Sequence, residues 1–483
     1  MIRTKVVVKY LGYILLFNSL FLLISAAISL FNNELSFKVL FTSALICAVL
    51  GVLPHFLIGK NGEINFHEGL AISVIGWFVT CIAGMLPYVM WGGEFNTVAD
   101  AFFESVSGYT TTGSSILNDV EALPKGLLFW RASTTFIGGV GIVLFVLLVL
   151  PEKRGAMPSF YRSEMSDLSK MNFAMRSRQV IRIIVMVYLS LIISETILLK
   201  VAGMNFFDAV THSFSTVATA GFSTKNLSIA YYQNPWIEII IMVFMLLSSL
   251  HFGLLYLTIL GKKQNIFTSR PVRAYVMVMF TGIIIITLQL THNDIYDNIW
   301  ESLRYASFQV ISLASTTGLV TADTSVWPVF SILLLCYFTI QNGMVGSTSG
   351  GLKFDRVYLF FNSLKKQLNL ILHPEGIYPI KMDKKVIEHD LELQIVVFIV
   401  LYILTFSVTT LLLTLMGIDG MTAFSASIAT LGNVGPGFGE VSSFSNYRML
   451  PDAAKYILSG NMLLGRLEIM NVIALIMMLA GKK

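Results

Sequence analysis

Residues 110–113 read Thr110-Thr111-Thr112-Gly113 and lie between a short apolar run and a much longer one. Three other segments occupy the same place between apolar runs: Ala218-Thr219-Ala220-Gly221, Ser315-Thr316-Thr317-Gly318 and Gly432-Asn433-Val434-Gly435. We call them the four glycine segments. One Thr-Thr-Gly tripeptide carries almost no information, but four in equivalent positions indicate an internal repeat.

The residues around the glycines support this repeat. Each glycine follows a Thr, or an Asn in the last segment, two positions earlier. Ser107 precedes Gly113 by the same distance as Ser215 precedes Gly221. The whole set of segments, and not any one of them, indicates the repeat.

The composition is that of a membrane protein. Of 483 residues, 55% are hydrophobic and 13% are charged, whereas about 25% are charged in a soluble domain. Apolar runs of about 18 residues or more, long enough to cross a bilayer, recur along the chain. The predicted spans are 10–31, 38–58, 69–91, 124–150, 178–201, 235–260, 273–291, 326–342, 352–372, 392–416 and 455–480.

Four shorter apolar pieces have the length of half-helices that enter the membrane and turn back. They are 97–110, 205–217, 299–314 and 419–431, and a glycine segment follows each. Non-helical backbone is tolerated at membrane depth only where it is surrounded by protein or a water-filled cavity. We therefore predict an all-α polytopic membrane protein, with four membrane–pore–membrane repeats around a pseudo-fourfold pore and two extra N-terminal helices.

The predicted division of the chain follows from these repeats. The two N-terminal helices take residues 1–66. The four pore repeats take 67–160, 161–265, 266–385, in which the second helix is broken, and 386–483. At the centre, carbonyl oxygens from four extended segments would replace the hydration shell of a cation, and glycine permits the positive φ that aligns successive carbonyls. The half-helices would direct their partly negative C-terminal ends at the same point. Both effects favour a monovalent cation.

Basic residues predict the orientation, because positive charges collect on the cytoplasmic side of a membrane protein. They fall in gaps that lie on one side if the spans alternate: Arg3, Lys5 and Lys9; Lys153, Arg154, Arg162, Lys170, Arg176 and Arg178; Lys262, Lys263, Arg270 and Arg273; Lys353, Arg356, Lys365, Lys366, Lys381, Lys384 and Lys385; Lys482 and Lys483. The opposite loops hold Glu94, Asp119, Glu121, Asp294, Asp297, Asp323 and Glu440. An acidic outer mouth would attract cations, although each acid taken singly fits an ordinary solvated loop equally well.

Other classes of function find little support in the sequence. The net charge of +5 comes from residues between apolar runs and does not form a basic domain of the kind that binds nucleic acid. Cys47, Cys81 and Cys336 lie inside apolar stretches without metal-ligand spacing. A membrane enzyme acting on lipids would need clustered intramembrane carboxylates or histidines, and we find none. We therefore expect neither an enzyme nor a cofactor.

The sequence resembles the Trk/Ktr/HKT superfamily of potassium transporters, and within it the bacterial TrkH-type subunit. The resemblance covers nearly the whole chain. It rests on the four glycine segments, Gly138-Gly139-Val140-Gly141-Ile142, the glycine-rich stretch 343–351, Leu464-Gly465-Arg466-Leu467-Glu468 and the two extra N-terminal spans. One departure is His251 in the sixth span, where relatives often carry Asn.

The resemblance implies a function and a set of site residues. The transported ion would be potassium, bound as a metal ion by all sixteen residues of the four glycine segments. Arg466 lies in an apolar run, where an unpaired charge costs roughly 2.5 to 3.5 kcal/mol; the resemblance makes it a barrier to cations below the filter. A local salt bridge is the alternative.

The stretch 343–351 interrupts an otherwise long helix, and broken helices at membrane depth often mark transport sites. The resemblance makes it an intramembrane loop that obstructs the pore, with Gly343, Gly346, Gly350 and Gly351 as gating residues. A plain interhelical loop is the alternative.

The expected mechanism is potassium uptake by passive, gated conduction across the bacterial inner membrane, with both termini cytoplasmic. A symporter that couples potassium to sodium or protons is the alternative. The resemblance also implies a homodimer and a cytosolic, nucleotide-binding regulatory ring of TrkA type. The lipid bilayer is the remaining partner, and no nucleic acid is expected.

Overall fold

The structure is a computed structural model that describes residues 3–58, 64–149, 177–383 and 385–481. The basic side chains predicted at 153–178, and those of Lys384, Lys385, Lys482 and Lys483, lie outside what is described. The described chain is a bundle of helices, with one two-stranded antiparallel pair, β1 (Lys381–Met382) and β2 (Lys385–Val386), in which Lys381 lies opposite Val386.

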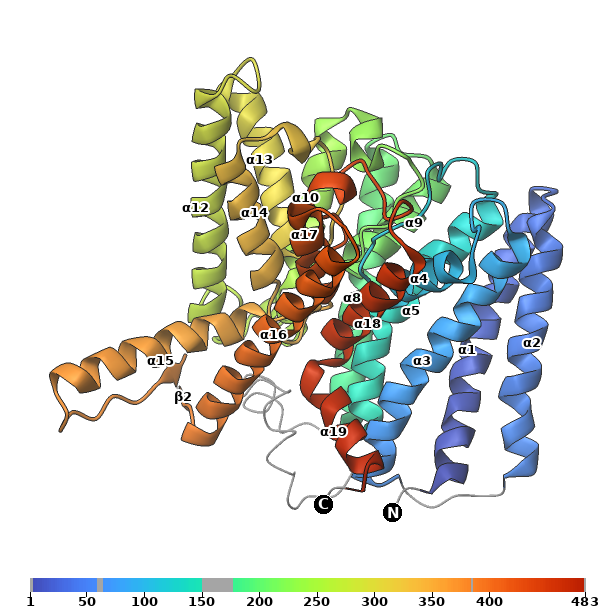
Figure 1. Ribbon diagram of the computed structural model, residues 1–483, viewed down its shortest axis with the longest axis horizontal. Helices are drawn as coiled ribbons and strands as arrows, with labels where there is room; N and C mark the ends of the chain where they lie inside the picture. The colour runs from blue at the N-terminus through green and yellow to red at the C-terminus, as the bar shows by residue number, and fades with distance from the viewer. Residues whose placement is uncertain (1–2, 59–63, 150–176, 384, 482–483) are drawn as a thin grey trace.

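Long apolar helices make this chain a multi-pass membrane protein. Among the described residues, six helices are long and apolar enough to cross a membrane, or up to eight if two bent pairs each count as one span. The N-terminal pair, α1 (Thr4–Phe31) and α2 (Ser36–Leu57), packs together at one flank of the molecule (Figure 1). Many large apolar side chains on these helices are exposed, as expected for a surface that faces lipid.

The remaining helices follow the predicted repeat. The first has α3 (Phe66–Trp91), α4 (Val98–Tyr109) and α5 (Lys125–Val149); the second α8 (Ser177–Val201), α9 (Phe206–Val217), α10 (Pro235–Ser249) and α11 (Phe252–Ile259); the third α12 (Arg270–His292), α13 (Ile299–Ala314), α14 (Val329–Gln341) and α15 (Phe354–Leu372); the fourth α16 (His389–Leu415), α17 (Gly420–Leu431), α18 (Asp452–Leu467) and α19 (Ile469–Leu479). Short 3-10 turns, η1 (Ser228–Tyr232), η2 (Thr324–Val326) and η3 (Gly439–Val441), lie in the connections.

The four predicted half-helices are confirmed as α4, α9, α13 and α17. Each begins at an N-cap residue whose side chain accepts a hydrogen bond from the backbone of the first turn: Thr97, Asn205, Asn298 and Asp419. Such caps are typical of helix starts. They explain why these short helices begin abruptly after a loop.

Two predicted spans are broken, which the sequence analysis did not anticipate. The span 235–260 bends by 107° between α10 and α11, and the span 455–480 bends by 101° between α18 and α19. At the first break the His251 ring accepts a hydrogen bond from Gly253 N, which caps α11. At the second break Glu468 has a φ of 63°, outside the helical range.

The prediction that residues 352–372 cross the membrane is also wrong. It corresponds to α15, which is not among the described helices that are apolar enough to cross a membrane. It carries Lys365 and Lys366 on its surface, and it lies across the direction of α12 and α14 (Figure 1). Polar side chains along the helix are the physical reason.

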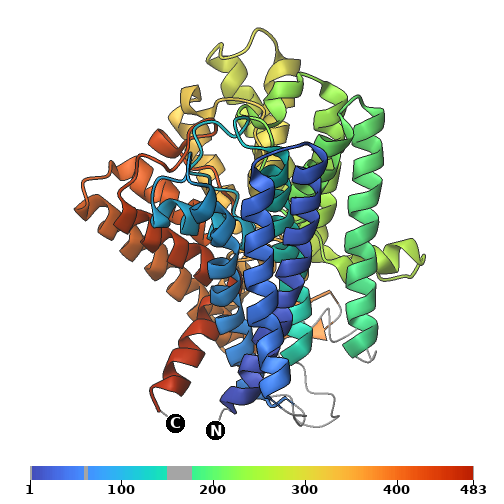
Figure 2. The same ribbon diagram turned by 90° about the vertical axis from the view of Figure 1, so that its right-hand side faces the viewer.

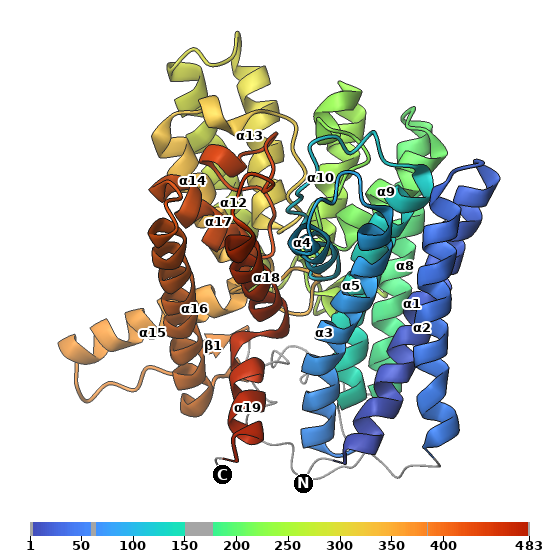
Figure 3. The ribbon, with the colours of Figure 1, turned by 45° about the vertical axis from the view of Figure 1, so that its right-hand side comes forward.

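Figures 2 and 3 show how the repeats are arranged around a centre. Both termini lie at the same end of the molecule (Figure 2). The first half-helix, α4, packs against α18 of the last repeat, so the two ends of the repeat series meet (Figure 3). This contact closes the arrangement around one axis.

Candidate functional site

The backbone of the four glycine segments is left-handed at equivalent places. Gly113, Gly221, Gly318 and Gly435 have φ values of 81°, 83°, 71° and 102°. The residues two positions earlier, Thr111, Thr219, Thr316 and Asn433, have φ values of 52°, 55°, 64° and 55°. A non-glycine residue with positive φ is uncommon, and here it recurs four times. The repeat that the sequence predicted therefore exists in the backbone conformation.

The four glycine segments close into a ring. A β-carbon added to any of the four glycines would come within 3.0 Å of a carbonyl oxygen in the next segment: Gly113 meets Ala220, Gly221 meets Thr317, Gly318 meets Val434, and Gly435 meets Thr112. Because the fourth contact returns to the first segment, the carbonyl groups lie around one axis. No side chain fits at these four positions without moving the neighbouring backbone.

Each glycine segment is attached to its half-helix by the same hydrogen bond. Backbone N–H groups donate to carbonyls five residues earlier: Thr112 to Ser107, Ala220 to Ser215, Thr317 to Ser312 and Val434 to Ala429, over 2.8–2.9 Å. These bonds resemble the closing bonds of helix C-termini. They make the orientation of the segment depend on that of the half-helix.

Side-chain oxygens add polar groups at the same level. Thr111 Oγ1, Thr316 Oγ1 and Asn433 Oδ1 are buried and have no hydrogen-bond partner within the described residues. The Asn433 amide donates to Thr112 Oγ1 at 3.0 Å and to the Met462 carbonyl at 2.9 Å. Buried oxygens are usually hydrogen-bonded, so these three atoms are the exceptions at the level of the ring.

A polar cavity of about 200 Å³ lies against the ring and is lined by all four glycines. Its charged lining residues are Arg131 and Lys225. Arg131 Nε pairs with Glu104 at 2.5 Å, and Lys225 Nζ pairs with Glu121 at 3.4 Å. None of the seven acids predicted for an acidic mouth lines this cavity, so that prediction is wrong for the space next to the ring.

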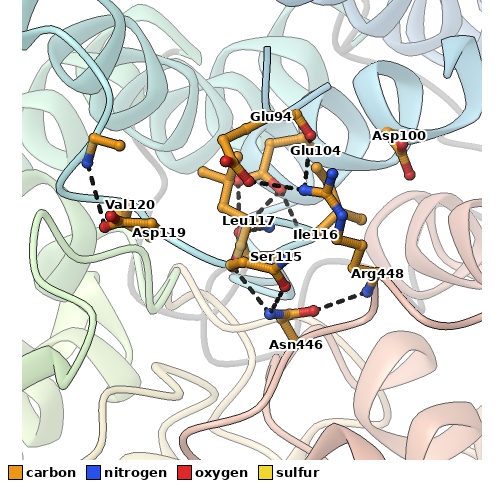
Figure 4. Close-up of polar contacts among 12 residues, drawn as sticks. Glu94, Asp100, Glu104, Ser115, Ile116, Leu117, Asp119, Val120, Asn446 and Arg448 are labelled. Atoms are coloured by element: carbon orange, nitrogen blue, oxygen red, sulfur yellow. Dashed lines mark hydrogen bonds and ion pairs between the residues drawn. The ribbon is translucent and has the colours of Figure 1, made fainter. Parts of the chain in front are cut away.

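The loops around this cavity are bonded to one another across repeats (Figure 4). Asn446, which follows the fourth glycine segment, donates to the carbonyl of Leu117, which follows the first glycine segment, at 3.1 Å. Asn226 of the second repeat accepts from Val120 N at 2.7 Å. Its amide also donates to Asp119, and this hydrogen bond lowers the pKa of the Asp119 carboxyl. The outer ends of the segments are therefore fixed to their neighbours.

Arg466 lies in the interior and is bound by carbonyl groups. Its Nη1 donates to the Thr348 carbonyl at 2.5 Å, and its Nη2 donates to the Gly138 carbonyl at 2.9 Å. A local salt bridge with Glu468 is not formed, because Glu468 pairs with Arg356 at 2.8 Å. The guanidinium therefore joins the stretch 343–351 to α5 in the first repeat.

The stretch 343–351, which we call the intramembrane loop, is buried against the glycine segments. Thr348 Oγ1 donates to the Val217 carbonyl and Ser349 Oγ donates to the Ser315 carbonyl, both at 2.9 Å. A β-carbon on Gly350 would meet the Asn433 side chain. These contacts reach the second, third and fourth repeats, which excludes a plain solvent-exposed connection.

The same loop is paired with the break between α10 and α11. Met344 N donates to the Ser249 carbonyl at 2.9 Å, and Phe252 N donates to the Gly346 carbonyl at 3.0 Å. Gly346 also packs on the His251 ring, where a β-carbon would clash. A β-carbon on Gly343 would likewise clash with Ser349, and a β-carbon on Gly351 would clash with Asn342.

Several polar residues of this region were not singled out from the sequence. The sequence predicts Lys353 in a basic connection, but it is buried and its Nζ donates to the Ser349 carbonyl. Asn342 ends α14 and donates to the Gly432 carbonyl at 3.0 Å. Their position beside the glycine-rich stretch was the only available signal in the sequence.

A multi-pass bundle with four half-helices and a closed ring of carbonyl groups defines a membrane protein of the cation-transport class. The sequence model of the family described as "TrkH: Cation transport protein" matches residues 36–482. This chain belongs to the TrkH family, which is a family of transporters and not of enzymes.

Individual relatives agree with this assignment. The chain is 37% identical over 420 residues to the Trk system potassium uptake protein TrkH of Salmonella typhimurium, covering 86% of each chain. It is 32% identical over 478 residues to the Trk system potassium uptake protein TrkG of Escherichia coli K12, covering 98% of each. The crystal structure of the potassium transporter TrkH from Vibrio parahaemolyticus matches with a TM-score of 0.88 and 30% identity, covering 98% of each chain.

Proposed function

We propose that this chain takes up potassium across the bacterial inner membrane by passive, gated conduction through the ring of glycine segments. The observation that carries the proposal is the closed ring, in which each glycine faces a carbonyl of the next segment. Rings of backbone carbonyls select cations by replacing their hydration shell. The names of the relatives, potassium uptake proteins, support potassium as the cation.

The sixteen residues of the four glycine segments would form the filter. Their backbone carbonyls bind the dehydrated ion, and the unpartnered oxygens of Thr111, Thr316 and Asn433 supply further ligands. The partly negative C-terminal ends of α4, α9, α13 and α17 precede these segments directly, which favours a cation at the centre. The polar cavity against the ring would receive the hydrated ion from outside.

The gate would consist of Arg466 and the intramembrane loop. A guanidinium stays protonated under all physiological conditions, so it opposes cations that leave the ring. The loop is held against the second and third repeats by the hydrogen bonds of Thr348 and Ser349. Opening requires both to move, with Gly343, Gly346, Gly350 and Gly351 permitting the change of backbone.

The partners proposed are a second copy of the chain and a cytosolic, nucleotide-binding ring of TrkA type. The basic residues near α11, α12 and α15 would lie on the cytoplasmic side together with both termini, which lie at one end of the molecule (Figure 2). The regulatory ring would act on the gate from this side.

The proposal is tested by ion flux into liposomes that contain the purified chain, with potassium compared against sodium. Gly113→Ser places a side chain against the Ala220 carbonyl at a positive φ, so the preference for potassium should fall toward equality. Gly460→Ala is the matched control, because a β-carbon there meets nothing within 4 Å. It should leave the preference unchanged.

Two results would contradict the proposal. If neither the wild type nor Arg466→Ala passes any cation, the pore interpretation fails. If the potassium current does not reverse at its Nernst potential, and the reversal shifts with sodium or pH, a coupled symporter replaces passive conduction.

A further inference from the structure

Glu195 is an intramembrane carboxyl group that the mechanism above does not use. It lies within the membrane-spanning part of α8, Arg182–Val201, and is fully buried. Neither of its carboxylate oxygens has a hydrogen-bond partner within the described residues. An ionised carboxylate without a partner is strongly disfavoured in such a place, and ionisable residues inside a membrane are usually functional.

The surroundings of Glu195 place it behind the second glycine segment. Ile192 and Leu199, on the same face of α8, belong to apolar clusters that include residues of α9. The Thr216 hydroxyl, in the last turn of α9, lies beside the carboxyl group and also lacks a hydrogen-bond partner. The Thr216 carbonyl in turn accepts from Thr219 N at 3.0 Å, within the glycine segment.

No described cation neutralises this carboxyl group. The helices packed against α8 are α9, α10, α11 and α5. Their titratable and charged side chains in the described part of the chain are Asp208, His212, Glu238, Tyr256, Lys125 and Arg131. Five of these side chains bond elsewhere: Asp208 with Thr224, His212 with Ser223, Glu238 with Arg304, Arg131 with Glu104, and Lys125 with Asn32.

The ends of the other three half-helices each have a polar contact with another part of the protein. These contacts are Tyr109 Oη to Asn18 Oδ1 at 2.5 Å, Tyr275 Oη to the Ala314 carbonyl at 2.9 Å, and Asn342 Nδ2 to the Gly432 carbonyl at 3.0 Å. All three join uncharged groups. At the end of α9, the neighbouring polar group is the Glu195 carboxyl group of α8.

We propose that Glu195 is a positioning residue for the filter: it carries a proton, and its neutral carboxyl group supports the end of α9 through Thr216. A protonated carboxyl has one O–H donor, and the Thr216 oxygen has unfilled acceptor capacity. The pair thereby gives the end of α9 an uncharged contact, as the ends of the other half-helices have. This inference rests on the proposed conduction through the glycine segments and adds a residue that sets its selectivity.

The first measurement is the infrared absorption of the purified wild-type chain and of Glu195→Gln in detergent. The wild type should show the carbonyl band of a buried, protonated carboxyl group, and the Gln variant should lack it. This measurement does not depend on transport. Absence of any band that Glu195→Gln removes would overturn the proposal.

The second measurement compares potassium and sodium flux in liposomes. Glu195→Gln keeps a neutral hydrogen-bonding group and should keep the wild-type preference for potassium. Glu195→Leu fills a similar volume without hydrogen bonding and should lower that preference several-fold, and Thr216→Val should do the same if the Leu variant does not fold. Ile193→Ala, on an exposed face of the same helix, is the control.

The outcomes separate this inference from the proposed function. If the wild type passes no cation, the proposed function fails, and the infrared band still decides whether Glu195 carries a proton. If the wild type selects potassium but Glu195→Gln loses selectivity as Glu195→Leu does, or neither variant nor Thr216→Val changes it, the positioning role is wrong.

Discussion

Among single residues, Arg466 shows how strongly the surroundings determine what a charge does. Its guanidinium is buried and bound by two carbonyl oxygens, with no acidic partner among its hydrogen bonds. Carbonyl dipoles stabilise the cation without cancelling its charge. The positive charge therefore remains available to repel a passing ion, as the proposed gate requires.

Replacing Arg466 should increase conduction by the chain alone. Two unit charges 4 Å apart interact by about 4 kcal/mol at an effective dielectric constant of 20. Even a third of that barrier corresponds to a roughly tenfold change in rate. Arg466→Ala should therefore raise potassium flux into liposomes by about tenfold or more.

Arg466→Lys is the matched variant, because it keeps the charge but loses the planar fork that reaches two carbonyls. Its flux should lie between those of the wild type and Arg466→Ala. Equal flux in all three proteins would show that Arg466 is not a barrier to cations.

Among the elements, the intramembrane loop is the one whose role depends most on its contacts. It is bonded to the end of α9, to the third glycine segment, to Arg466 and to the break between α10 and α11. The last contact explains why the sixth span is broken, since Ser249 and Phe252 pair with the loop instead of continuing a helix. Movement of the loop therefore requires α10 and α11 to adjust.

Weakening the contacts of this loop should favour the open state. Thr348→Val and Ser349→Ala together remove the bonds to the Val217 and Ser315 carbonyls. Each hydrogen bond contributes about 1 kcal/mol, so the pair should raise potassium flux by roughly 5- to 30-fold.

Ser331→Ala provides the control for this change, because Ser331 is equally buried in α14 but its hydroxyl has no hydrogen-bond partner. Its flux should equal that of the wild type. A double variant with unchanged flux and unchanged selectivity would mean that the loop does not limit conduction.

For the whole molecule, the arrangement in the membrane gives a prediction that is independent of conduction. The loop holding Asp297, between α12 and α13, lies at the top of Figure 1, and the outer end of α15, which precedes the turn holding Glu375, lies in its lower half. Both side chains are exposed. With cytoplasmic termini, Asp297 should face outward and Glu375 should face the cytoplasm.

Thiol labelling measures this orientation. The three native cysteines are buried, so background labelling should be low. A membrane-impermeant maleimide should label Asp297→Cys in cells whose inner membrane is accessible from outside, and Glu375→Cys only in inverted vesicles. The reverse pattern would place the termini outside and overturn the predicted topology.

The class of fold and the position of the four glycine segments can be predicted from the amino-acid sequence alone. Apolar runs of spanning length, short half-helices and four recurring glycines are local patterns, and α4, α9, α13 and α17 confirm the half-helices. The left-handed φ at all four glycines follows from the one residue type that tolerates it without strain.

How these helices and segments meet could not be predicted from the sequence. The breaks at His251 and Glu468, the burial of Lys353 and the partners of Arg466 depend on contacts between residues about 90 or more positions apart in most cases. None of the seven acids expected at an acidic mouth lines the cavity, and three of them, Glu94, Asp119 and Glu121, bond to neighbouring loops. Local sequence patterns record propensity and hydropathy, whereas pairing across repeats is settled by which backbone groups remain unsatisfied once the helices have packed.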